Sequence, residues 1–406
     1  MPASERVTPE SASLRTRGFV TFALVAALGV AGWLPTSYFM SLLVREQLGG
    51  GIAGAALVIG TMHLARSIGA TVTGPWVTRL ESRGVHALGL AGMTALMVVL
   101  VVAPDVGWVI VAAPVAGLAM AFFWTGLQTY LIEIAPESRR GAAVGLVGFV
   151  VVLVPGVAGV AQGFVADAFG FRVFAIGAGT ALAAALALTL GALPRPTAVR
   201  TRRLAPGISF VRLMRFRGVA AVMVLRLAST VAYAAMILLA GPRVVEVGGD
   251  LRAVGAMTLV ASIGGAVAQL AIGRLSDRLG RRAVLAGILA LAVPATAAFG
   301  FVDSVPGLLV VATVWAVAMW GINTMSVSLC GDVAPPGSLS RVMVLDGTAY
   351  SAGAVIGAAV VLATAEASLD AAFYVGAAAM VVGLAALPLA ARAREATASG
   401  RRKSGP

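Results

Sequence analysis

Long apolar runs separated by short charged or Pro- and Gly-containing breaks make up most of the chain. The runs are continuous and do not alternate in period two. They therefore predict membrane-crossing helices, which need roughly 20 residues each, and not the strands of a membrane barrel. Twelve spans are predicted, at about 18–44, 52–78, 85–103, 106–134, 141–167, 171–193, 217–241, 251–275, 282–302, 305–333, 340–366 and 370–391. The first run is too long for the roughly 7–15-residue core of a signal peptide, so we expect it to remain as the first span.

The breaks of the second half repeat those of the first at an offset of 199 residues. Arg79 falls on Arg278, and Glu133 falls on Asp332. Since each copy holds six spans, both enter the membrane from the same side, as parallel repeats do. The predicted fold is an all-α membrane protein of twelve transmembrane helices in two pseudo-symmetric six-helix bundles. The predicted parts are an amino-terminal tail (1–17), the first bundle (18–193), a basic linker (194–216), the second bundle (217–391) and a carboxyl-terminal tail (392–406).

Composition supports a membrane protein and gives its orientation. The chain is 59% hydrophobic and 12% charged, with a mean hydropathy of +0.96, whereas soluble domains are about 25% charged. Arginines concentrate in the tails, the linker and alternate loops, while the other loops hold only Arg45, Arg172, Arg243 and Arg252. By the positive-inside rule, both termini are predicted to be cytoplasmic, in the inner membrane. This sidedness explains most of the net charge of +13, so no nucleic-acid partner is expected.

Several chemistries are not expected. Cys330 is the single cysteine, which excludes an intrachain disulfide and argues against a thiolate metal site. There is no G-x-x-x-x-G-K-[ST] motif, so transport energy would come from an ion or substrate gradient. We expect no cofactor, no metal and no enzymatic activity, and a monomer in the lipid bilayer.

The run G-R-L-S-D-R-L-G-R-R at 273–282, with a degenerate copy at 74–83, follows the eighth and second spans. With P-E-S-R-R-G-A-A-V-G at 136–145 and G-F-R-V-F at 170–174, it resembles the signature loops of the major facilitator superfamily over nearly the whole chain. The resemblance implies a secondary transporter whose halves rock about a midplane site. The residues expected to form a conformational latch are Gly273, Asp277, Arg278, Gly280, Arg281 and Arg282, with Gly74 and Arg79 of the copy.

The latch hypothesis has a physical basis in Asp277, which could accept hydrogen bonds from a helix N-terminus and pair with loop arginines. The alternative is that both loops only set topology and a tight turn. The copy has Thr78 in place of Asp277 and Glu81 in place of Gly280. We therefore expect a weaker first latch, in which Glu81 pairs with Arg79 or Arg83.

Four ionisable residues lie within predicted spans: His63, Arg66, Arg226 and Asp346. Such groups cost roughly 2.5–3.5 kcal/mol near the bilayer centre and usually serve function. Asp346 and His63 are the candidates for proton coupling, the latter because histidine titrates near neutral pH. Arg66 and Arg226 are candidates to meet an anionic or polar substrate group. The alternatives are packing or hydrogen bonding for His63, bonds to helix carbonyls for the arginines, and pairing with Arg341 or loop arginines for Asp346.

In the resembled fold, spans 1, 2, 4, 5, 7, 8, 10 and 11 line the substrate cavity. The polar and aromatic candidates on those spans are Tyr38, Arg66, Trp124, Gln128, Gln162, Arg226, Tyr233, Gln269, Trp320, Asn323 and Tyr350. The fifth span, with Pro155, Gly156, Gly159 and Gly163, partly resembles an antiporter signature, although ordinary small-residue packing explains it equally well.

The predicted function is proton-coupled efflux of a small organic compound that is drug-like, sugar-like or a secondary metabolite. Uptake or facilitated transport of a sugar or organic anion is the first alternative. A non-transporting sensor or scaffold is the second.

Overall fold

The structure is a computed structural model, and it describes residue 14 and residues 16–136, 139–195, 209–335, 338–364 and 368–403. These residues form helices and no strands. The first half holds α1 (Arg17–Glu46), α2 (Gly51–Val102), α3 (Val106–Ile134) and α4 (Arg140–Gly191). The linker holds the short α5 (Phe210–Met214), and the second half holds α6 (Arg217–Glu246), α7 (Leu251–Leu279), α8 (Arg281–Ala298), α9 (Val305–Val333), α10 (Leu339–Thr364) and α11 (Leu369–Lys403).

Two helices of the first half are each a pair of membrane spans. α2 and α4 have 52 residues, which at 1.5 Å per residue is about 78 Å of helix, far more than the roughly 30 Å of a bilayer core. Each is interrupted at one residue with positive φ, Glu81 in α2 (φ 58°) and Gly170 in α4 (φ 82°). Eleven helical segments among the described residues are long and apolar enough to span a membrane, and one of them, Ala142–Gly191, contains the Gly170 break. The twelve predicted crossings are thus present.

The internal repeat is visible in the backbone. Gly49 and Gly248 both have positive φ (66° and 89°), and so do Glu81 and Gly280 (58° and 84°). Both pairs are separated by the predicted offset, as are the starts and the ends of α3 and α9. A β-carbon strains this conformation, so Glu81 keeps a turn that the second copy makes with glycine.

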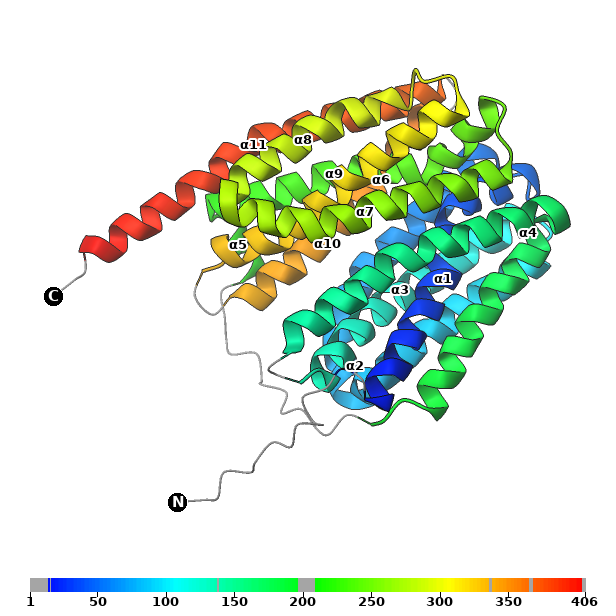
Figure 1. The fold of residues 1–406 in the computed structure, drawn as a ribbon, viewed down its shortest axis with the longest axis horizontal. Coiled ribbons are helices and arrows are strands. Elements are labelled where there is room, and N and C mark those ends of the chain that lie inside the picture. The colour runs from blue at the N-terminus through cyan, green and yellow to red at the C-terminus, as the bar shows by residue number, and fades with distance from the viewer. Residues whose placement is uncertain are drawn as a thin grey trace.

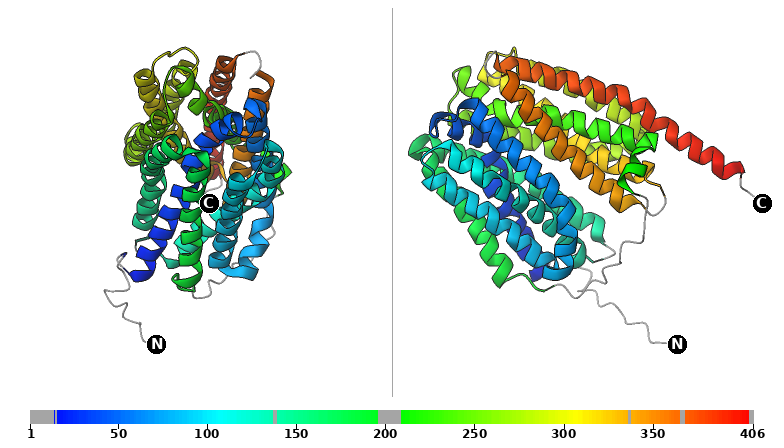
Figure 2. Two further views of the ribbon diagram at one scale, coloured as in Figure 1. Left: turned by 90° about the vertical axis from the view of Figure 1, so that its right-hand side faces the viewer. Right: turned by 180° about the vertical axis from the view of Figure 1, so that it is seen from behind.

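The two halves form separate bundles that meet along three helix pairs. α4 packs on α7, α2 packs on α10, and α1 packs on α6. Figures 1 and 2 show the bundles lying together at one end and diverging toward the end where α1 begins and α5 lies. The diverging end carries the arginine-rich loops and is the predicted inner face. α11 continues past the predicted last span to Lys403, so the first part of the predicted tail is helical.

Candidate functional site

A cluster of charged and aromatic side chains lies where the bundles meet, and Tyr350 of α10 is at its centre. The guanidinium carbon of Arg66, on α2, is 4.7 Å from the centroid of the Tyr350 ring. The guanidinium carbon of Arg226, on α6, is 4.9 Å from the same centroid. Two cations from different halves of the protein therefore share one ring, an arrangement stabilised by the ring quadrupole.

Arg226 has two further partners in the second half. Its Nη2 donates a hydrogen bond to Oδ1 of Asn323 on α9 at 2.7 Å, and its Nε lies 3.4 Å from Oδ2 of Asp346 on α10. The Arg226 and Asp346 side chains are only 11% and 7% exposed. Asp346 precedes Tyr350 by four residues and so lies on the same face of α10. Arg226 and Asp346, two separate candidates in the sequence, are therefore neighbours in the structure.

The Arg226 site keeps unused hydrogen-bonding capacity. Nε of Arg226 and Oδ1 of Asp346 have no hydrogen-bond partner among the described residues, and neither does Nδ1 of the buried His63. Arg66 has no acidic partner in the described part of the chain. Buried polar groups normally have partners, so these buried atoms retain hydrogen-bonding capacity that the described residues do not use. We refer to Arg66, Arg226, Asn323, Asp346 and Tyr350 as the central charge cluster.

Aromatic rings border the central charge cluster. Tyr233 of α6 lies 5.9 Å from Tyr350 and stacks on Trp315 of α9 at 6.1 Å with nearly parallel planes. The His63 ring lies 6.0 Å from that of Tyr350, and Tyr38 of α1 is partly buried against the same apolar core as Tyr233. Sequence reasoning missed Trp315. The signal was its spacing of eight residues from Asn323, which places both on one side of α9.

The other predicted cavity residues have different surroundings. Gln162 of α4 donates to the carbonyl oxygen of Ala31 on α1 at 2.8 Å, and Trp320 packs over Gly265 of α7. Gln269 faces Gly148 of α4. The Trp124 ring lies 5.2 Å from that of Phe123 with nearly perpendicular planes, and Gln128 is exposed. Among the described residues, no hydrogen bond, ion pair or ring contact joins these five residues to the central charge cluster.

The predicted latch loops make equivalent contacts in both halves. In the second half, Nη1 of Arg281 lies 2.5 Å from Oδ2 of Asp332, at the end of α9. In the first half, Ser82 donates a hydrogen bond to Glu133, at the end of α3. Both contacts tie the loop after the second span of a repeat to the end of its fourth span. The two halves thus keep the same contact position with different chemistry.

The remaining latch residues are only partly described. Gly280 makes the turn that ends α7, Gly273 lies within α7, and Gly74 lies within α2. The side chain of Asp277 lies outside the described residues. The expected pairing of Glu81 with Arg79 or Arg83 is not seen among the described residues, where Arg83 donates to the carbonyl oxygen of Leu190. Glu81 instead occupies the strained turn.

The sequence and the fold were compared with those of known proteins. The sequence matches the family model described as Major Facilitator Superfamily over residues 19–244 and 219–406. The chain belongs to the major facilitator superfamily. It is therefore a multi-pass membrane transporter, and the expected family is confirmed. No match is found among the sequences of curated proteins.

Solved structures share the fold of this transporter. One is a peptide transporter POT in complex with sulfate, with 14% identity, a TM-score of 0.73, and coverage of 95% of this chain and 98% of that chain. Another is a POT family transporter in complex with a thioalcohol-conjugated peptide, with 12% identity, a TM-score of 0.74, and coverage of 93% and 96%. At these identities the likeness shows the fold alone.

The halves of the transporter are held together at the predicted outer face by α4 and α7. Gly156, Gly159 and Gly163 of α4 face Ser262, Thr258 and Gly255 of α7, so closely that a β-carbon at Gly159 would overlap the Thr258 side chain. Nearby, Nε of Arg252 lies 2.7 Å from Oδ2 of Asp167. The glycines of the antiporter-like segment thus permit close contact between the halves.

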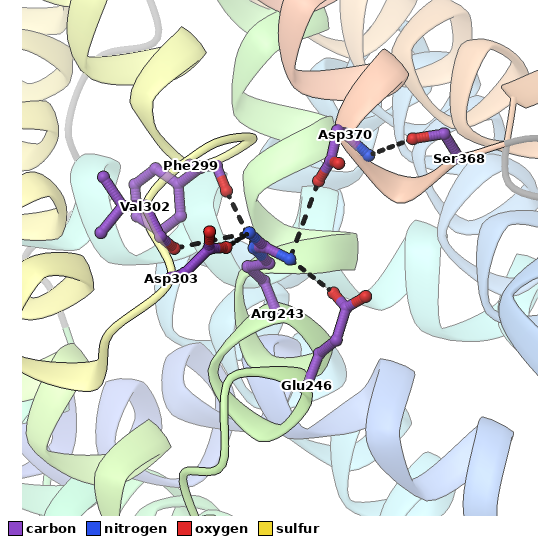
Figure 3. Close-up of polar contacts among 7 residues, drawn as sticks. All are labelled: Arg243, Glu246, Phe299, Val302, Asp303, Ser368 and Asp370. Atoms are coloured by element: carbon purple, nitrogen blue, oxygen red, sulfur yellow. Dashed lines mark hydrogen bonds and ion pairs between the residues drawn. The ribbon is translucent and has the colours of Figure 1, made fainter.

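A second buried cation lies at the predicted outer end of α6. Arg243 is 6% exposed and contacts three acids: Asp303 at 2.6 Å, Glu246 at 2.9 Å and Asp370 at 3.9 Å. It also donates to the carbonyl oxygen of Phe299 at 3.2 Å. Figure 3 shows these groups converging on the guanidinium from α6, the loop before α9 and the start of α11. Sequence reasoning placed Arg243 in an outer loop and missed this role in joining three parts of the second bundle.

Proposed function

We propose that this transporter couples protons to the movement of small organic anions that carry an aromatic or apolar part. The observation that carries the proposal is the central charge cluster, in which Arg66 and Arg226 share the Tyr350 ring while Asp346 is the one carboxylate among its members. A cation held within a membrane is costly, and an anionic substrate group would compensate it. The rings of Tyr233 and Trp315 provide an apolar surface beside it.

The pairing of Arg226 with Asp346 supplies a coupling mechanism. A substrate anion and the Asp346 carboxylate compete for the same guanidinium, since both are acceptors for its charge-assisted hydrogen bonds. Protonation of Asp346 removes this competitor and so favours binding of the anion. Proton and anion would then bind together and cross the membrane together. This geometry therefore favours co-transport over antiport.

Proton-coupled efflux is the second candidate. It is favoured by the antiporter-like segment of α4, whose glycines form the contact with α7. The two candidates differ in the sign of coupling. In co-transport, an anion accumulates on the side toward which protons flow, whereas in antiport it accumulates on the opposite side.

The test is flux into proteoliposomes with an imposed pH gradient. The panel consists of aromatic sulfonates and their neutral sulfonamides, because sulfonates remain charged and do not cross the bilayer as neutral acids. We expect only the anions to accumulate. Arg66→Gln should weaken transport roughly 10- to 100-fold in kcat/KM, as expected for loss of charge-assisted hydrogen bonds.

The matched control is Arg45→Gln, which removes an exposed arginine at the end of α1 and should leave transport near the wild-type rate. Equal transport of sulfonates and sulfonamides would contradict the proposed substrate class. Unchanged transport by Arg66→Gln would contradict the role of the cluster.

A further inference from the structure

The segment that leads from the linker into the second bundle has an unusual surface. Four large apolar side chains are exposed there: Phe210 (45%), Val211 (73%), Met214 (41%) and Phe216 (42%). Arg212, Arg215 and Arg217 alternate with them and are also exposed. The sequence 209–217 contains no acidic residue, and none of the three arginines has an acidic partner among the described residues.

This segment is anchored to the second bundle, so its exposed surface has a fixed position. Leu213 is fully buried in the core of that bundle, and α5 packs against α6 and α10. The Ser209 hydroxyl caps α5 by accepting a hydrogen bond from the backbone N–H of Arg212 at 3.3 Å. α6 begins at Arg217, so α5 lies where a membrane span starts. Figure 1 shows α5 at the diverging end of the bundles.

We propose that α5, with Phe216 and Arg217, is a membrane-surface site that binds anionic phospholipids. Apolar side chains interleaved with arginines match the boundary between acyl chains and headgroups, where the rings and methyls enter the lipid and the guanidiniums bind phosphate. The charge is complementary to the negative surface of a cytoplasmic leaflet, on the face where this segment is predicted to lie. Because α5 contacts α6 and α10, two helices of the central charge cluster, lipid bound there contacts the half that carries Arg226 and Asp346.

The test uses the full chain reconstituted in liposomes of phosphatidylcholine alone or mixed with phosphatidylglycerol. An environment-sensitive fluorophore is attached at Val211→Cys, and the wild-type chain, whose only cysteine, Cys330, is buried, controls for labelling elsewhere. In the phosphatidylglycerol mixture we expect blue-shifted emission and reduced quenching by iodide. Arg212→Gln/Arg215→Gln should weaken the response to phosphatidylglycerol by roughly fivefold per arginine, and high salt should weaken it in the wild type.

The control variant is Arg139→Gln/Arg195→Gln, which removes one exposed arginine before α4 and another after it and should respond like the wild type. An equal loss in this control would overturn the assignment to α5. Identical emission in both lipid mixtures would also overturn it, since the environment of Val211 would then not depend on an anionic headgroup. The same response to inorganic phosphate over phosphatidylcholine would indicate a soluble-anion site and refute the membrane assignment.

Discussion

Replacing Asp346 by asparagine isolates the charge that distinguishes the two coupling schemes. The substitution preserves size and removes the only carboxylate paired with Arg226 among the described residues, while the Asn323 hydrogen bond at 2.7 Å remains. Arg226 then carries an uncompensated charge at a site where it is 11% exposed. If Asp346 is both the competitor of the substrate and the proton carrier, this variant should bind anions more tightly and lose proton coupling.

The size of the stability effect follows from the geometry. At 3.4 Å and an effective dielectric constant of about 20, the Coulomb attraction is about 5 kcal/mol. Removing one partner of a buried pair typically costs about 3–5 kcal/mol. The remaining bond to Asn323 and the partial exposure of Arg226 place the expected loss near the lower end, about 3 kcal/mol. Because removal of both charges eliminates the unpaired cation, Arg226→Gln/Asp346→Asn should be more stable than Asp346→Asn alone.

Two measurements check this reasoning. In thermal unfolding in detergent, the wild type should have the highest melting midpoint and Asp346→Asn the lowest. The midpoint of the double variant should lie between them. In proteoliposomes, Asp346→Asn should retain exchange of labelled for unlabelled anion but lose accumulation driven by the pH gradient by roughly tenfold or more, since the proton no longer has a carrier. Accumulation that survives in this variant would refute Asp346 as the coupling residue. A double variant no more stable than the single one would refute the energetic role of the pair.

Three further predictions concern other parts of the transporter. Gly159→Val should slow transport, because the valine side chain would push Thr258 and α7 away from α4. The control is Gly177→Val, because a β-carbon at Gly177 would have no neighbouring atom within 4 Å. This control should have little effect on the same flux. Arg243→Gln should lower stability by about 2 kcal/mol in thermal unfolding, since it removes charge-assisted hydrogen bonds to partly exposed acids, and should leave substrate affinity unchanged. Asp277→Asn should slow substrate flux while the protein is expressed at its normal level. If the variant transports at the wild-type rate, the loop at 273–282 serves only to set topology.

The fold could be predicted because membrane helices follow local rules. Each span is a long apolar run, and each loop is marked by residues that cannot remain in lipid. Even the turn at Glu81 was marked by its alignment with Gly280, although its positive φ could not be foreseen from a residue type that disfavours that conformation. In contrast, α11 continues to Lys403, past the predicted last span, and no hydrophobic pattern marks its end.

The site was less predictable because it is built from pairs distant in sequence. The charged residues within spans identified His63, Arg66, Arg226 and Asp346 as candidates, since such charges are costly in lipid. The approach of His63 and both arginines to the Tyr350 ring depends on how the two bundles pack, and a single sequence carries no direct signal of that packing. Arg243 was missed because its position at a helix end is equally compatible with solvent.

The distribution of the central charge cluster between the halves bears on how the transporter could work. Arg226, Asn323, Asp346 and Tyr350 all belong to the second bundle, so a rigid rocking of the bundles would not by itself separate Arg226 from Asp346. Arg66 alone comes from the first bundle, and its contact with Tyr350 crosses the α2–α10 interface. Rocking must therefore change the surroundings of Arg66 more than those of Arg226. A substrate anion that bridges the two guanidiniums would link the bundles at this point, and its binding energy would then differ between the two states, as a change in their populations requires.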